Sequence, residues 1–424
     1  MLTLKLIRDN KEFVIERLAI KNNNARTSVE KIIELDKLRK SFQNQSDNKL
    51  AELNKVSQKI GQLIKSGQKE QAEQAKQVTI NLKEDTRRLT QQLSDTEKQL
   101  QEILITLPNL PHSSVPSGKS AKDNIIVRSG GPKITENENM LPHWDLAKKY
   151  DIIDFDLGNK ITGTGFPVYK GKGAKFQRSL ISFFLDEAIK AGFREVIPPF
   201  MVNPDSGFGT GQLPDKDGQM YYITFDNFYL IPTAEVPVTN IFRDVVLNES
   251  DFPVKYTAYT PCFRREAGSY GKDVRGLNRL HQFDKVEIVV IENPKNSYTQ
   301  LETMVNYVES LVVKLCLPYR ILKLCGGDMS FTSALTYDFE VYSEAQKRWL
   351  EVSSVSNFES FQANRLKLRY KDEVTKKNQL AHTLNGSALA LPRVVAALLE
   401  NNQTVNGIKI PDVLVPYTGF KLID

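Results

Sequence analysis

Two neighbouring segments in the second half of the chain carry side chains suited to holding a nucleotide. Residues 256–263 are predicted to form a strand that ends in Arg264 and Glu266, and residues 280–291 a second strand that carries Phe283. An arginine can neutralise a phosphate, an aromatic ring can stack on a base, and a carboxylate can accept from an exocyclic amine. The sequence therefore predicts a candidate nucleotide platform here, with a surface ion pair between Arg264 and Glu266 as the alternative.

A second arginine stands at the start of a predicted helix near the C-terminus. Residues 384–387, Leu-Asn-Gly-Ser, lead into an apolar helix over residues 389–399, with Pro392 and Arg393 in its first turn. A cation is disfavoured at a helix N-terminus, and a bound anion would reverse that effect. Arg393 is therefore a candidate phosphate ligand, unless a nearby carboxylate pairs with it.

Two more segments place carboxylates among apolar residues that read as strands. Glu235 follows residues 229–232, Tyr-Leu-Ile-Pro, and Glu351 follows Trp349-Leu350. A buried carboxylate must be paired, protonated or bound to a metal. Glu351 together with Ser354 is a candidate pair of Mg²⁺ ligands, and a strand edge that faces water is the alternative.

The elements that precede these segments include a long helical hairpin. Apolar and small residues recur at alternating steps of three and four from Ala72 to Leu107, and a second such run spans residues 35–63. Because only Ser66-Gly67 punctuates the two runs, the helices must fold back antiparallel. Arms of roughly 37 residues would be about 55 Å long, so we expect an N-terminal antiparallel coiled-coil hairpin over about residues 28–107, either a binding arm or a dimerisation element.

A break after this hairpin divides the chain into two predicted domains. Pro108, Pro111 and the Ser/Pro/Gly-rich residues 113–120 end the helix. We therefore expect an N-terminal domain over residues 1–110 and a mixed domain of strands and helices over residues 111–424.

Composition and failed motifs narrow the function. The 424 residues hold 57 Lys+Arg and 51 Asp+Glu, with 40% apolar residues, which is globular composition. No run approaches the roughly 18 apolar residues of a membrane span, and no signal-peptide core is present, so a cytoplasmic protein is expected. Three cysteines without C-x-x-C spacing and four scattered histidines exclude a disulfide framework or zinc knuckle. Walker A, G-x-G-x-x-G, G-x-S-x-G and H-E-x-x-H patterns are absent.

Taken together, Arg264, Phe283 and Arg393 resemble the signature of class II aminoacyl-tRNA synthetases. The finer pattern is similar to the seryl-tRNA synthetases, in family order along essentially the whole chain. The matching segments are Phe208-Gly209-Thr210-Gly211-Gln212-Leu213-Pro214, Thr233-Ala234-Glu235, Phe263-Arg264-Arg265-Glu266-Ala267-Gly268, Leu280-His281-Gln282-Phe283-Asp284-Lys285-Val286-Glu287, Glu351-Val352-Ser353-Ser354 and Asn385-Gly386-Ser387.

The resemblance implies an α+β fold, an antiparallel sheet flanked by helices, and a role for each matching residue. Arg264, Arg393 and Glu351 would be catalytic, with Arg264 on the α-phosphate and Arg393 on the γ-phosphate of ATP. Phe283 would stack on adenine and Glu266 would read its amino group. The resemblance assigns ATP binding to Arg264, Arg265, Glu266, Leu280, Phe283, Glu351, Val352, Ser353, Ser354 and Arg393. It assigns serine binding to Thr233, Ala234, Glu235, Glu287, Asn385 and Ser387, and Mg²⁺ to Glu351 and Ser354.

The same resemblance implies the reaction and the partners. L-Serine would be activated by ATP to seryl-adenylate, and the seryl group would pass to the 3′ end of tRNA(Ser), and also of tRNA(Sec). The hairpin would grip the tRNA, and the enzyme would act as a homodimer through the segment around Pro198-Pro199. Two alternatives remain, which are a noncatalytic binding protein descended from such an enzyme and a ligase for another small amino acid.

Overall fold

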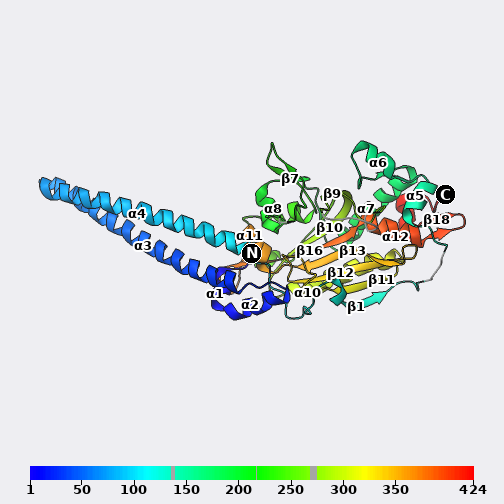
Figure 1. Cartoon of the computed structure of the whole chain (residues 1–424), viewed down its shortest axis with the longest axis horizontal. Coiled ribbons are helices and arrows are strands. Elements are labelled where there is room, and N and C mark those ends of the chain that lie inside the picture. Colours follow the sequence, from blue (N-terminus) through cyan, green and yellow to red (C-terminus); the bar gives the residue numbers. More distant parts are fainter. Residues whose placement is uncertain (135–138, 216, 268–274) are drawn as a thin grey trace. The chain divides into compact units, whose positions relative to one another are not determined.

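The computed structural model describes residues 1–134, 139–215, 217–267 and 275–424, and these residues form two compact units (Figure 1). One unit comprises Met1–Ala19 and Asn23–Pro108, and the other comprises Ile20–Asn22 and Asn109–Asp424. Residues 268–274, in the segment between the two predicted strands that carry Arg264 and Phe283, lie outside the described residues.

The N-terminal unit is dominated by two long antiparallel helices, as the periodicity predicts. The helices of this part of the chain are α1 (Leu4–Asp9), α2 (Lys11–Ile20), α3 (Arg26–Lys65) and α4 (Lys69–Leu104). At about 1.5 Å per residue, the 40 residues of α3 span roughly 60 Å and the 36 residues of α4 roughly 54 Å. The turn between α3 and α4 contains Gly67 at φ 76°, a left-handed conformation that glycine adopts without strain. Helix α4 ends three residues before Leu107, where the apolar repeat ends.

The threonines along the seam of the hairpin satisfy their hydroxyls within their own helix. Thr79, Thr86 and Thr96 each donate to the carbonyl oxygen four residues earlier, at 2.7–2.9 Å. Polar groups can therefore line the seam without needing a partner on α3. Leucines such as Leu82, Leu89 and Leu100 supply the buried apolar surface between the threonines.

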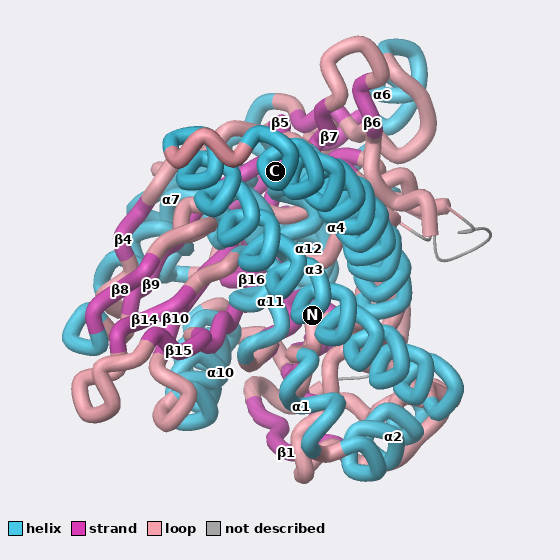
Figure 2. Tube along the Cα trace, turned by 90° about the vertical axis from the view of Figure 1, so that its left-hand side faces the viewer, coloured by secondary structure: helices cyan, strands magenta, loops and turns pink. Residues whose placement is uncertain are grey.

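The C-terminal unit is built on an eight-stranded sheet in which all pairings are antiparallel except that of its last strand. The order is β1 (Ile125–Gly130), β11 (Tyr319–Lys323), β12 (Leu335–Ser343), β13 (Arg348–Asn357), β16 (His382–Ala390), β10 (Gln282–Glu292), β9 (Val254–Phe263) and β4 (Arg194–Glu195). Figure 2 shows β10, β9 and β4 side by side, with β4 parallel to β9. This sheet confirms the predicted α+β fold class.

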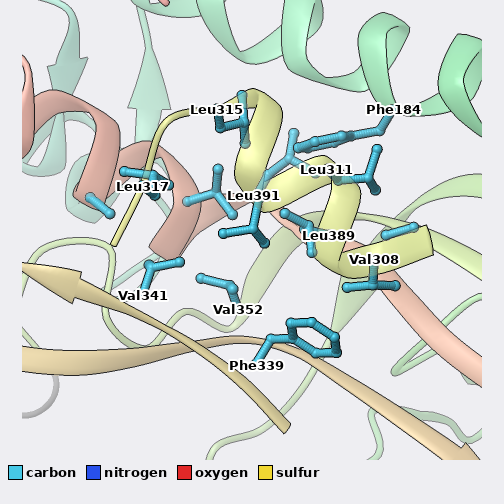
Figure 3. Packing of buried hydrophobic residues seen from close by; sticks show 14 of the residues in the cluster. Phe184, Val308, Leu311, Leu315, Leu317, Phe339, Val341, Val352, Leu389 and Leu391 are labelled. Carbon is cyan, nitrogen blue, oxygen red and sulfur yellow. The ribbon is translucent and has the colours of Figure 1, made fainter. Parts of the chain in front are cut away.

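Three helices pack apolar faces against this sheet, namely α7 (Gly171–Lys190), α10 (Ser297–Lys314) and α12 (Leu391–Asn401). Phe184 of α7, Leu311 of α10 and Leu391 of α12 meet Phe339 and Val352 of the strands in one buried cluster (Figure 3). Burying each such side chain contributes about 1.5–3 kcal/mol. The cluster therefore anchors the sheet whose strands carry the candidate site.

Shorter elements surround the sheet. The helices are α5 (His143–Lys149), α6 (Phe155–Ile161), α8 (Pro204–Thr210), α9 (Glu235–Asn240), α11 (Ser360–Leu366) and α13 (Val415–Thr418). The strands of the four small sheets are β2 (Ile153–Asp154), β3 (Val168–Tyr169), β5 (Met201–Val202), β6 (Tyr222–Ile223), β7 (Phe228–Leu230), β8 (Val246–Asn248), β14 (Arg369–Lys371), β15 (Asn378–Leu380), β17 (Gln403–Thr404), β18 (Gly407–Lys409) and β19 (Leu422–Ile423).

Two local predictions need correction. Glu235 does not lie in an apolar strand, because β7 ends at Leu230 and Glu235 is the first residue of α9. The predicted C-terminal helix begins at Leu391 and not at residue 389, because residues 384–387 and Leu389 still belong to β16. Pro392 lies in the first turn of α12, as predicted, where its missing N–H costs no helical hydrogen bond.

Candidate active site

The residues predicted to bind serine lie around Lys285, a residue to which the sequence analysis gave no role. The ammonium of Lys285 lies 2.7 Å from the hydroxyl of Thr233 and 2.6 Å from a carboxylate oxygen of Glu287. Ser387, opposite Glu287 in the β10–β16 ladder, donates to the same oxygen at 3.4 Å. Lys285 and Glu287 are two residues apart on β10, so their side chains point to the same face of the sheet. That spacing was the signal by which Lys285 could have been found.

Glu235 adds a second buried carboxylate beside this cluster. Its oxygen accepts from the amide of Gln362 at 2.6 Å, and its backbone N–H donates to the Thr233 hydroxyl at 3.2 Å. Burial, with the Glu287 carboxylate adding to it, raises the pKa of Glu235 to about 7. Gln362 and Asn385 act in the opposite direction, because their hydrogen bonds favour the charged form. Gln362 comes from α11 and had no sequence signal.

Two more residues were predicted to bind serine. Ala234 is fully buried between Thr233 and Glu235, and Asn385 lies on β16 beside Glu235. Six predicted residues from three segments of the sequence are thus placed around a few buried polar groups. A compact cluster of donors and acceptors is suited to a small, polar, charged ligand.

The predicted nucleotide residues Arg264 and Phe283 lie together at the paired ends of β9 and β10. The Arg264 guanidinium carbon is 5.2 Å from the centre of the Phe283 ring, and its Nε donates to the Pro232 carbonyl at 3.3 Å. Antiparallel pairing sets this proximity, because Phe283 is opposite Cys262, two residues before Arg264. The two side chains therefore offer a cation and an aromatic face within one site.

Glu266 is held by a partner from the far side of the loop. Its backbone is left-handed, at φ 47°, and its carboxylate accepts from Arg279 at 2.9 Å. The ion pair anticipated for Glu266 is thus present, but with Arg279 in place of Arg264. Arg265 is exposed, and its N–H donates to the Gln219 carbonyl.

A bulge in β13 brings Glu351 and Ser354 to the same side of the sheet. Ser353 pairs with Phe339 and Glu351 with Glu340, so Val352 is an extra residue without a partner on β12. Residues three apart in a regular strand face opposite sides, and one extra residue removes that difference. Val352 instead packs in the apolar cluster (Figure 3).

The donor set around this bulge fits a hard cation such as Mg²⁺. Asp338 is opposite Ser354 on β12, and its Oδ1 is buried without a hydrogen-bond partner among the described residues. Burial, followed by the nearby Glu351 carboxylate, raises the pKa of Asp338 well above its ordinary range. Two carboxylates and a hydroxyl are oxygen ligands of the kind that Mg²⁺ prefers. Asp338 had no sequence signal, because its proximity depends on strand register.

Arg393 lies near this group at the start of α12. Its Nε donates to the Asn278 carbonyl at 3.1 Å, and one terminal nitrogen donates to the Glu351 carbonyl at 2.9 Å. The Glu351 carboxylate is also 3.8 Å away, so the carboxylate partner considered for Arg393 is present at long range. The side chain is partly exposed and remains able to meet an anion.

Two further residues predicted to bind ATP do not direct their side chains toward Arg393 and Glu351. Leu280 is buried in the apolar cluster, and the hydroxyl of Ser353 donates within the sheet to the Ser387 carbonyl at 2.6 Å. Any contact of Leu280 or Val352 with a nucleotide would therefore have to come from the backbone.

Known proteins resemble this chain along its whole length. Residues 1–111 match the seryl-tRNA synthetase N-terminal domain, and residues 222–402 match the tRNA synthetase class II core domain (G, H, P, S and T). The serine–tRNA ligase of Salinibacter ruber is 49% identical over 424 residues, which covers 100% of this chain and 99% of that protein.

Solved structures give the same answer. Seryl-tRNA synthetase from Pyrococcus horikoshii, complexed with ATP, superposes with a TM-score of 0.92 at 33% identity, covering 100% of this chain and 99% of that one. Cytoplasmic serine–tRNA ligase from Naegleria fowleri, in complex with AMP, gives a TM-score of 0.88 at 25% identity, covering 100% of this chain and 99% of that one.

The antiparallel sheet with its arginine, phenylalanine and carboxylate cluster defines a class II aminoacyl-tRNA synthetase. Within that class, the full-length matches carry the N-terminal domain as well as the core. The chain belongs to the seryl-tRNA synthetase family and is an enzyme of the ligase type. In the part of the chain that the structure describes, no helix has the length and apolar character to cross a membrane.

Proposed function

We propose that this chain activates L-serine with ATP to form seryl-adenylate and transfers the seryl group to the 3′ end of tRNA(Ser), and also of tRNA(Sec). The observation that carries this proposal is the buried group of Thr233, Lys285, Glu287 and Ser387, which is small, polar and charged. It lies in a chain related over its full length to serine–tRNA ligases.

Serine is selected by hydrogen bonding and by size. Glu287 and Ser387 meet the serine hydroxyl, while Thr233 and Glu235 position the amino group. Alanine lacks the hydroxyl and leaves the Glu287 carboxylate, 2% exposed, with one partner fewer, and this is the costly kind of mismatch. A longer side chain would have to fit among groups that are all buried, which supports selection by size.

Activation needs no covalent nucleophile from the protein. The serine carboxylate attacks the α-phosphate in line, the bond to the bridging oxygen breaks, and pyrophosphate leaves. Arg264 stabilises the charge at the α-phosphate, Arg393 holds the γ-phosphate, and Phe283 and Glu266 hold the adenine. Catalysis is then positioning and charge stabilisation.

Mg²⁺ enters this proposal as the companion of ATP. Glu351 and Ser354 would hold the ion, and its charge would offset that of the phosphates. The Asp338 Oδ1 beside these two residues has no hydrogen-bond partner in the part of the chain that the structure describes, which supports a cation at this position. Asp338 is included in the proposed donor set for this reason.

Transfer to tRNA requires the N-terminal domain, which we place at residues 1–110, ahead of a catalytic domain over residues 111–424. Residues 1–107 hold 20 basic and 15 acidic residues, so nearly all of the chain's net charge of +6 lies there. The hairpin over residues 28–107 holds 14 of these basic and 12 of these acidic residues, so most of the bias lies in residues 1–27. A positive bias on the N-terminal domain is suited to a polyanion. The hairpin grips the tRNA while the catalytic domain receives the acceptor end.

A homodimer in the cytoplasm is the proposed working form. The segment around Pro198-Pro199 is flanked by large apolar side chains that are open to solvent in the single chain. Ile197 is 84% exposed, Phe200 40% and Met201 51%. Exposed apolar side chains close together in the sequence support an interface with a second copy of the chain at this segment.

Serine-dependent exchange of labelled pyrophosphate into ATP tests the reaction directly. Exchange with serine, and far less with alanine or threonine, is the expected result. Exchange with another small amino acid but not with serine would identify a different ligase. Absence of exchange with any amino acid would favour the noncatalytic binding protein.

A further inference from the structure

A buried histidine and glutamate hold the chain just after the segment that the structure does not describe. The N–H of Leu277 donates to Nε2 of His143 at 2.8 Å, and Nδ1 of His143 lies 2.6 Å from a carboxylate oxygen of Glu400. Because Nε2 accepts, the imidazole is neutral and its proton is on Nδ1, directed at Glu400. His143 and Glu400 are both completely buried.

Two further side chains close these contacts into a ring. Gln346 donates from its amide nitrogen to Glu400 at 3.0 Å, and its amide oxygen accepts from Asn278 at 3.1 Å. Asn278 follows Leu277 in the chain, so the path returns to its start. We call His143, Glu400, Gln346 and Asn278, with the Leu277 N–H, the polar ring.

Gly276 lies directly against His143 of the polar ring. A Cβ at Gly276 would collide with the His143 imidazole, and its φ of +66° is one that glycine adopts readily. Glycine at position 276 lets the backbone come close to the His143 imidazole, where any other residue would place its Cβ in a clash.

Helix α12 is connected to residues 277–278 at two points. Glu400 holds Leu277 through His143, and Arg393, seven residues earlier on α12, donates to the Asn278 carbonyl at 3.1 Å. The position of Arg393 relative to residues 277–278 is therefore tied to the polar ring. A shift in the ring would move a hydrogen-bond partner of the proposed phosphate arginine.

The contacts of Glu400 are directed hydrogen bonds, which ordinary apolar packing does not provide. Ser343, Gln346 and His143 all donate to its carboxylate, yet among the described residues no lysine or arginine pairs with it. Burying a carboxylate without a cation costs stability, which a hydrophobic residue at the same place would avoid. The gain is in directed contacts, which fix a geometry.

We propose that the polar ring is a positioning device for ATP binding, acting through Asn278 on Arg393. This proposal rests on the proposed function, in which Arg393 meets the γ-phosphate. The ring residues are positioning residues, not catalytic ones, because none of them needs to touch a substrate. Loosening the ring should therefore weaken the interaction with ATP and leave that with serine unchanged.

Gln346→Ala is the primary variant, because Gln346 is half-buried in a turn and its loss breaks the link between Glu400 and Asn278. The same change removes a hydrogen bond from Nε of Arg348, which lies outside the polar ring. Glu400→Gln is the second variant. Its amide nitrogen would face groups that donate to the Glu400 carboxylate, so at least one of their hydrogen bonds would be lost. Asn402→Ala is the matched control. Its amide donates to the Leu398 carbonyl at the end of the same helix, outside the ring.

The expected result for Gln346→Ala in pyrophosphate exchange is a KM for ATP about tenfold higher, with the KM for serine within twofold of wild type. Asn402→Ala should change neither. Equal changes in the two KM values, or no change in a folded variant, would overturn the proposal. If Glu400→Gln does not fold, Gln346→Ala alone decides.

A spectroscopic measurement reads the ring without the reaction. The Arg275 guanidinium lies 4.6 Å from the ring centre of Trp144, and Trp349→Phe removes the only other tryptophan. In that background, Gln346→Ala should make Trp144 easier to quench with acrylamide, and unchanged quenching would contradict the proposal. Calorimetric titration with ATP alone tests the ring even if serine proves not to be the substrate.

Discussion

The ammonium of Lys285 lies 2.6 Å from the carboxylate of Glu287, and the two side chains are 6% and 2% exposed. Both come from one face of β10, and Lys285 also reaches the Thr233 hydroxyl. A carboxylate that binds a serine hydroxyl must be buried to be selective, and a paired cation favours its charged form there. Lys285 supplies that cation from within the site, which leads to the first prediction.

Lys285→Met should leave Glu287 as an unpaired buried charge. Breaking a buried pair from one side costs about 3–5 kcal/mol, so we expect a clear fall in the free energy of unfolding and loss of serine activation. The double variant Lys285→Met with Glu287→Gln should recover much of the stability but not the activity. Chemical unfolding and pyrophosphate exchange measure the two effects. A double variant no more stable than the single one would argue against the pairing.

Glu287→Ala should weaken discrimination between serine and alanine by up to several kcal/mol, since the buried partner of the hydroxyl is removed. The measurement is the ratio of kcat/KM for the two amino acids. Glu292→Gln is the control, because Glu292 is another buried carboxylate on β10, whose oxygen accepts from the Asn293 N–H. An unchanged ratio in Glu287→Ala would remove Glu287 from the proposed serine pocket.

Glu235 should make the folded chain lose stability as the pH rises. Its pKa is about 7 in the folded chain and about 4.5 when unfolded, so between these values only the folded chain keeps the proton. Rising pH then favours unfolding, by roughly 3 kcal/mol across the interval. Glu235→Gln stays neutral and should lack this loss. Unfolding free energies of both proteins at pH 5 and pH 8 test this, and parallel pH dependences would refute it.

Glu351→Gln should raise the Mg²⁺ concentration that gives half-maximal pyrophosphate exchange by about tenfold, because one charged ligand is lost. Glu340→Gln is the matched control. Glu340 is opposite Glu351 on β12, but its carboxylate pairs with Arg320. If both variants have the same Mg²⁺ requirement as wild type, Glu351 is not a ligand.

Replacing residues 30–105 by a short linker should leave serine activation intact and abolish tRNA charging. The buried groups around Lys285 and Glu287 all come from residues beyond 200, whereas this deletion removes most of α3 and α4. Exchange of pyrophosphate and aminoacylation of tRNA are measured on the same preparation. A parallel loss of both activities would contradict the proposed division of labour.

Much of the architecture could be predicted from periodicity and ordered motifs. The heptad pattern predicted α3 and α4 and the turn between them, and the apolar run with Pro392 predicted α12 to within two residues at its start. Such elements depend on neighbours along the chain, and their signals are local. The prediction that Glu235 lies in an apolar strand was wrong. Apolar residues precede a buried residue at the start of a helix as well as one inside a strand, so the local pattern does not distinguish the two.

The family could be assigned from the sequence alone, since residue types in a fixed order require no coordinates, and the same motifs predicted a set of site residues. Where those side chains lie relative to one another became clear only from the folded chain. The extra residue at Val352 turns Glu351 and Ser354 to one side, strand register brings Asp338 to them, and the polar ring joins His143 to Glu400 across 257 positions. Register, bulges and burial arise from contacts between distant segments, so no local pattern of residues records them.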